Sequence, residues 1–265
     1  GGAYWLWMII LFSFILQAVS YEFQSKAGNL LGKKTYQIFL VINGVVGPVL
    51  LGGAVATFFT GSNFYINKDN MADQLMPVIS SWANGSHGLD ALLNLWNVCL
   101  GLAVFFLARV LGLLYFTNNI DDKELNPRFH KALLPNALLF LVFFLVFAVY
   151  VLLKDGFAVN PQTRMIVMEP HKYLANFIEL PAVLISFLAG VVLVLFGIIK
   201  SFFDSKFKSG IWFTGIGTVL TVLALFLCAG LNNTAYYPSN VDLQSSLTLA
   251  NSSSSLFTLK TMAFV

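Results

Sequence analysis

The sequence predicts an all-α fold, a polytopic transmembrane helical bundle with six full membrane spans and a truncated seventh. Hydrophobic residues make up 58% of the 265-residue chain and charged residues only 10%, and the mean hydropathy is +0.79. Soluble proteins carry about 25% charged residues. A soluble core of this length could not hide so much apolar surface from water, so we expect lipid around most of the chain.

Seven apolar segments divide the chain. A membrane-spanning helix needs about 20 residues at a rise of about 1.5 Å each, and the first six segments reach or approach that length. The segments are residues 4–20, 36–60, 92–117, 133–153, 177–200, 210–230 and 256–265. The last is short and the first has no loop before it, so we expect a fragment of a longer protein. The fragment, residues 1–265, is predicted to be a single membrane-embedded domain without a cleaved signal peptide.

Basic residues alternate between the connecting loops. One set of loops holds nine Lys and Arg and the other holds four. The richer set contains Lys26, Lys33, Lys34, Lys123, Arg128, Lys131, Lys200, Lys206 and Lys208. The positive-inside rule therefore places the first set of loops in the cytoplasm and the long loops 61–91, 154–176 and 231–255 outside.

Two outer loops have a pattern of their own. In residues 61–91 the apolar side chains recur at helical spacing, which predicts a short helix lying in the membrane interface. These side chains are Met71, Leu75, Val78, Ile79 and Trp82. The loop 231–255 is polar and almost uncharged, and we expect it to form an ordered cap over the helix ends.

An acid stands where the first apolar segment ends. Glu22 follows a stretch without charges and lies near the carboxyl end of a predicted helix, where the helix dipole disfavours a negative charge. It needs either a partner, for which Lys26 at position i+4 is suitable, or a function.

Two further charges lie within or beside apolar segments. Arg109 is predicted about two turns from the cytoplasmic end of its helix, either as an anchor that reaches the interface or as a member of a buried ion pair. Glu179 is predicted at the outer start of the fifth helix, just before Pro181, where an acid favours the dipole.

Small residues and a proline interrupt the second segment. Gly47, Pro48 and Gly52 indicate either close helix packing with a kink or a broken helix around a substrate. Packing is favoured because no matching broken helix occurs elsewhere in the chain.

The sequence contains no pattern of metal or haem ligands. The three histidines, His87, His130 and His171, are all predicted in loops, and Cys99 and Cys228 are predicted as small buried apolar residues. We therefore expect no metal, haem or other cofactor to be bound by this chain's side chains. Without a clustered basic face, nucleic acid is not expected as a partner.

Four stretches of the sequence form a recognisable set of motifs. They are YEFQSK at Tyr21–Lys26, GPVLLGGA with Pro48, Gly52 and Ala54, LLN at Leu92–Asn94, and SLTLANSSSSLFTLKTM at Ser246–Met262. Together they resemble one known family, subunit II of cytochrome bd-type quinol oxidases. Leu95 stands where the family often has proline. The resemblance covers the whole chain and implies a fragment of a nine-helix subunit, lacking the first two helices and the end of the last.

The resemblance implies the function of the assembly. Such a complex oxidises quinol, reduces oxygen to water and takes up protons from the cytoplasm in a bacterial inner membrane. Haems b and d and the quinol site belong to the haem-bearing subunit I, which subunit II stabilises. Membrane lipid is a further expected partner, and the resemblance allows a structural quinone.

The resemblance also points to a proton path. Glu22 coincides with a family acid linked to proton entry, and Gln17 stands where better-known members have an arginine. The arginine–acid pair is therefore absent, and the path needs another cation or a different route. Two alternatives remain open at this point: a secondary membrane transporter of unknown substrate, and a purely structural membrane subunit.

Overall fold

The computed structural model describes residues 1–265 except 1–2, 68–79, 250, 252–259, 262–263 and 265. The described part is mostly helical, and six of its helices are long and apolar enough to cross a membrane. They are α1 (Tyr4–Phe23), α2 (Lys33–Thr60), α3 (Leu95–Asn119), α4 (Leu125–Leu153), α6 (Pro181–Phe203) and α7 (Gly210–Gly230). The predicted fold class and six spans are thereby confirmed. The predicted seventh span, 256–265, falls largely outside the described residues.

Two predicted segments differ from the structure by more than three residues at a boundary. The helix α4 begins at Leu125, about two turns before the predicted apolar segment 133–153. Its first two turns are largely polar, so hydrophobicity alone did not include them in the helix. His130 therefore lies in a helix and not in a loop. The segment predicted as 177–200 divides into a short amphipathic helix, α5 (Lys172–Glu179), and the spanning helix α6, which has Pro181 at its first position.

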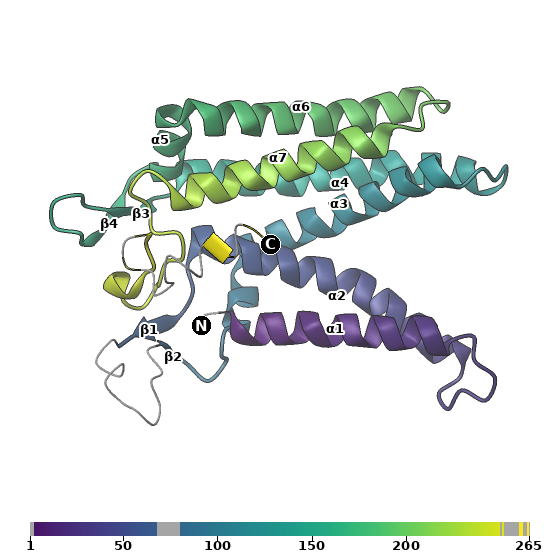
Figure 1. Cartoon of the computed structure of the whole chain (residues 1–265), viewed down its shortest axis with the longest axis horizontal. Coiled ribbons are helices and arrows are strands. Elements are labelled where there is room, and N and C mark those ends of the chain that lie inside the picture. Colours follow the sequence, from purple (N-terminus) through teal and green to yellow (C-terminus); the bar gives the residue numbers. More distant parts are fainter. Residues whose placement is uncertain (1–2, 68–79, 250, 252–259, 262–263, 265) are drawn as a thin grey trace.

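Successive helices pack side by side, with α1 on α2, α2 on α3, α3 on α4, and α6 on α7 (Figure 1). Small residues allow the backbones to approach. A Cβ added to Gly52 would lie 2.7 Å from the Cα of Gly101, and one added to Gly217 would lie 2.6 Å from the carbonyl oxygen of Gly190. In a membrane such contacts hold helices together through van der Waals packing.

The two ends of the bundle differ in architecture. The three basic connections lie together at one end, which we call the basic end (residues 24–32, 120–124 and 204–209) (Figure 1). The opposite end, the cap end, carries two antiparallel hairpins, β1 (Phe64–Ile66) with β2 (Ser80–Trp82) and β3 (Gly156–Val159) with β4 (Ile166–Glu169). Two short 3-10 helices, η2 (Leu89–Leu93) and η3 (Leu243–Ser245), also lie there.

The cap end is ordered by the third outer loop. Residues 231–249 of this loop bridge to the first loop through Ser62 and Ser239 and to β3 through Ala158 and Thr234. Trp82, predicted in an interfacial helix, is in strand β2 instead, because its backbone pairs with Phe64. The other four side chains of that predicted helix lie outside the described residues.

Candidate functional site

Glu22 and Lys26 form an ion pair at the basic end of α1. The helical spacing brings the Glu22 Oε1 atom to 2.8 Å from the Lys26 Nζ atom, and both side chains remain more than half exposed. The hydrogen bond that Lys26 donates to Glu22 and the negative charge of Glu22 raise the pKa of Lys26, which lies beyond the end of the helix. Lys26 therefore supplies the positive charge that the carboxylate needs at this unfavourable end of the helix dipole.

A polar seam runs between α1 and α2, formed by Ser13, Gln17, Ser20 and Asn43. The Asn43 Nδ2 atom donates to the Gln17 Oε1 atom at 2.7 Å. Ser20 is fully buried, yet its Oγ atom and the Asn43 Oδ1 atom have no hydrogen-bond partner among the described residues. Buried polar atoms of this kind are commonly satisfied by water.

Gln17 and Glu22 do not contact each other directly. Five residues along an α-helix correspond to about 7.5 Å of rise and about 140° of rotation. Gln17 is exposed at the edge of the polar seam. Phe12 and Ile15, each about 60% exposed, lie five and two residues before it and therefore on the opposite side of α1.

Arg109 is held by an amide. Its Nε atom donates to the Oδ1 atom of the buried Asn136 at 2.6 Å, and its guanidinium lies 5.7 Å from the centre of the Phe105 ring. Within the described residues it makes no ion pair. The Asn136 Nδ2 atom donates in turn to the Ala132 carbonyl, which fixes the orientation of the amide.

Glu179 ends α5 and lies two residues before α6. It therefore lies near the outer start of the fifth spanning helix, as predicted, but it belongs to the separate short helix α5. Its Oε2 atom accepts a hydrogen bond of 2.7 Å from Asn232, which also donates to Asn176. Glu179 therefore ties the third outer loop to the helix ends.

Gly47 and Gly52, on either side of Pro48 in the middle of α2, face the neighbouring helices α1 and α3. The helix continues through Pro48 without a break. A Cβ added to Gly47 would lie 3.5 Å from the Phe14 ring of α1, and Gly52 lies against the backbone of α3.

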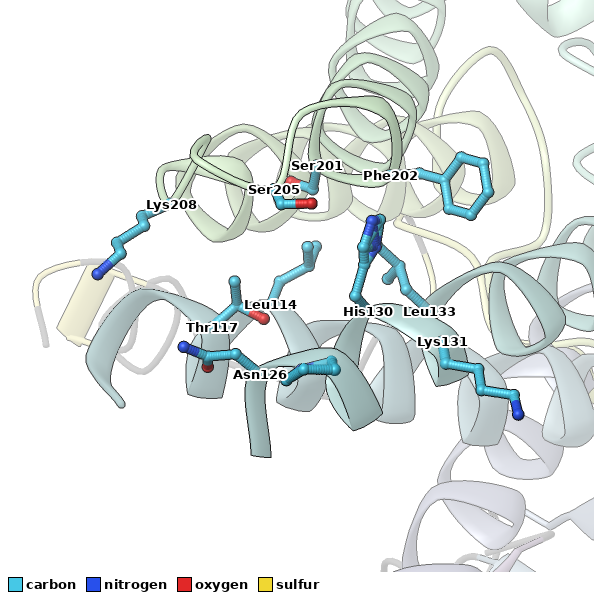
Figure 2. A pocket seen from close by; sticks show the side chains of 11 residues that line it. Leu114, Thr117, Asn126, His130, Lys131, Leu133, Ser201, Phe202, Ser205 and Lys208 are labelled. Carbon is cyan, nitrogen blue, oxygen red and sulfur yellow. The ribbon is translucent and has the colours of Figure 1, made fainter. Parts of the chain in front are cut away.

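A cavity of about 620 Å³ opens at the basic end between α3, α4, α6 and the connection to α7. His130 projects from α4 toward the end of α6, where Ser201 and Ser205 lie (Figure 2). The lining residues are Leu114, Thr117, Asn126, Pro127, His130, Lys131, Leu133, Ser201, Phe202, Ser205 and Lys208. Sequence reasoning missed this cavity, although the density of polar residues around the predicted start of α4 was visible.

The other two histidines, His87 and His171, lie at the cap end. His87 accepts at Nδ1 a hydrogen bond of 3.0 Å from the Trp5 indole, and His171 precedes α5 in a left-handed conformation with φ of 54°. Among the described residues, no group of three or more His, Cys, Asp and Glu side chains could hold a metal ion.

Lys154 is a further feature that sequence reasoning missed, because it treated this residue as an ordinary loop cation. Its Nζ atom donates to the Phe59 carbonyl at the end of α2 at 2.6 Å and lies over the rings of Tyr150 and Phe157. Burial lowers the pKa of this amine to about 8, although the neighbouring Asp155 opposes the change.

Taken separately, the charged site residues each find a local partner, and the structure brings none of Glu22, Arg109 and Glu179 together. The whole chain, residues 1–265, matches the family model described as cytochrome bd terminal oxidase subunit II. A comparison with curated proteins finds no match.

Proposed function

Because the chain belongs to the cytochrome bd terminal oxidase subunit II family, we propose that it conducts protons from the cytoplasm toward the haem-bearing subunit I. The family makes it a multi-pass subunit of a quinol:oxygen oxidoreductase and implies partnership with subunit I. The family match over the entire chain and the continuity of α2 both argue against a secondary transporter.

The proposed division of labour between the subunits follows the family resemblance of the sequence. Haems b and d and the quinol site are proposed in subunit I, as that resemblance implies. This chain is proposed to form a single domain in a bacterial cytoplasmic membrane, with its basic end in the cytoplasm. Its exposed apolar α1 face is proposed to stabilise subunit I.

The polar seam between α1 and α2 is the observation that carries the proton proposal. Glu22 lies at the basic end with its carboxylate open to water, so it can exchange protons with the solvent. Ser20 and Asn43 lie further into the bundle with unpartnered oxygen atoms, and water bound there would continue a hydrogen-bonded chain toward Gln17.

Gln17 alters the electrostatics of this path. An amide carries no charge, so it cannot balance a carboxylate as an arginine would. Lys26 is the cation that lies close enough to Glu22 to take that part, and it can hold the carboxylate charged between proton transfers. The route thus depends on one exposed ion pair at its entrance and neutral groups further inside.

The proposal is tested by replacing Glu22 with glutamine in the assembled complex. Glutamine keeps the shape and a hydrogen-bonding group but cannot bind and release a proton, so we expect a severalfold loss of oxygen consumption with unchanged haem content. Glu124→Gln is the matched control, because Glu124 is an exposed acid at the same end of the bundle. If Glu22→Gln complexes consumed oxygen at the parental rate, this subunit would have a structural role only.

A further inference from the structure

The cavity at the basic end has the properties of a lipid headgroup site, an assignment that is independent of the proton proposal. It lies where α3 ends and α4 begins, at the end of the bundle that the positive-inside rule places at the cytoplasmic surface of the membrane. Its volume of about 620 Å³ falls within the range of about 300–1,000 Å³ typical of small-molecule sites.

Two polar atoms in the cavity wall have no partner among the described residues. They are the Oδ1 atom of Asn126 and the Oγ atom of Ser201. Ser201 is only 7% exposed, and it comes from α6 while Asn126 comes from α4. Both atoms are covered by protein, and the Ser201 Oγ atom packs against Gly210 of α7, so a change of side-chain rotamer would be needed to turn either atom toward a ligand in the cavity.

The cavity wall is positively charged. Lys131 and Lys208 stand at opposite edges, and the lining residues include no carboxylate. Lys131 makes no ion pair within the described part of the chain, and Lys208 is 3.8 Å from the highly exposed Asp121, a pair too open to water to neutralise it. Both ammonium groups point outward in Figure 2, and their flexible stems can turn toward a bound anion.

Apolar side chains form the rest of the wall. Leu114 and Leu133 are buried beside the cavity, and Phe202 borders it with its ring 5.5 Å from that of His130. A free phosphate ion would leave this apolar surface uncovered. An amphiphile would cover it while its charged group met the lysines.

We propose that this cavity binds an anionic phospholipid of the membrane. The phosphate lies between Lys131 and Lys208, the glycerol region meets Asn126 and His130, and the first part of an acyl chain packs on Leu114 and Leu133. Basic pockets between transmembrane helices on the cytoplasmic side commonly receive such headgroups.

The test uses the assembled oxidase complex reconstituted in vesicles of phosphatidylcholine mixed with phosphatidylglycerol. Native mass spectrometry after extraction counts the phosphatidylglycerol molecules retained by each complex. Lys131→Ala combined with Lys208→Ala is expected to weaken retention of one phosphatidylglycerol by about tenfold, since each lysine near a membrane surface attracts anionic lipid. Lys123→Ala combined with Lys206→Ala is the matched control and should retain it, because neither residue lines the cavity.

Two further measurements identify the cavity and the lipid as the source of the effect. Asn126→Leu keeps both lysines and is expected to weaken retention as well, by a smaller factor. Equal losses in the two lysine pairs, or full retention in Asn126→Leu, would overturn the site. Excess inorganic phosphate should leave retention unchanged, and displacement of the lipid by phosphate would show an ion site instead.

Discussion

The two ends of the bundle treat buried polar groups in opposite ways. At the cap end, Asn176 is fully buried and all of its amide atoms are bonded to Cys228, Thr234 and Asn232. At the basic end and in the adjoining half of the helices, five buried side-chain atoms of the described residues lack a partner. They belong to Ser20, Asn43, Asn126, Ser201 and Thr214. The buried amide of the cap end is therefore fully bonded within the chain, whereas the basic half of the bundle leaves these five buried atoms without a partner among the described residues.

Two lysines repeat this contrast. Lys154 at the cap end is held by the Phe59 carbonyl between two aromatic rings, and burial lowers its pKa to about 8. Lys26 at the basic end is exposed, and its bond to Glu22 raises its pKa. Desolvation governs the first amine and a neighbouring charge governs the second.

Replacing Asn176 is expected to have the largest effect. Asn176→Leu would remove three buried hydrogen bonds, to the Cys228 carbonyl, the Thr234 hydroxyl and the Asn232 amide, at about 1–3 kcal/mol for each group that is left dry and unpaired. Asn232 keeps its bond to Glu179, and Thr234 keeps its bond to the Asn232 carbonyl. We expect a clear fall in the thermal unfolding temperature of the complex. Asn126→Leu is the matched control at the basic end and should unfold near the parental temperature. Equal destabilisation by both variants would remove the distinction between the two ends.

Lys154 should make stability depend on pH in the alkaline range. Its pKa of about 8 in the folded chain lies below its ordinary value of 10.5, so between these values the unfolded chain binds more protons. The free energy of unfolding must then rise with pH between 8 and 10.5. As the pH falls from 10.5 toward 8, the unfolded chain gains a proton that the folded chain does not bind, and stability is lost. Thermal unfolding from pH 8 to pH 10 should show a rise in the parental complex that is missing in Lys154→Met. Parallel curves for the two proteins would contradict the low pKa.

Hydrophobic length predicted the spanning helices because lipid imposes a simple rule on the backbone. The run 210–230 coincides with α7, and Lys26 could be named as the partner of Glu22 from helical spacing alone. The hairpins of the cap end were not predicted, since short strands such as Ser80–Trp82 depend on pairing with distant residues. Three other features also depend on contacts between distant parts of the chain, which a single sequence does not record. They are the Gln17–Asn43 hydrogen bond, the cavity at the basic end and the burial of Lys154.

Of the changes at Asn176, Lys154 and Lys26, Lys26→Ala should affect stability least, because the Glu22–Lys26 ion pair is open to water in this chain. Its side chain is 58% exposed and that of Glu22 is 62% exposed, and such pairs are screened by salt. We expect the thermal unfolding temperature of the complex to match the parental value at both low and high salt, with Lys123→Ala as the control. A marked, salt-insensitive loss would mean that the partner subunit covers this pair. The entrance to the proposed proton path would then be closed within the interface, and Glu22 would exchange protons with subunit I instead of with water.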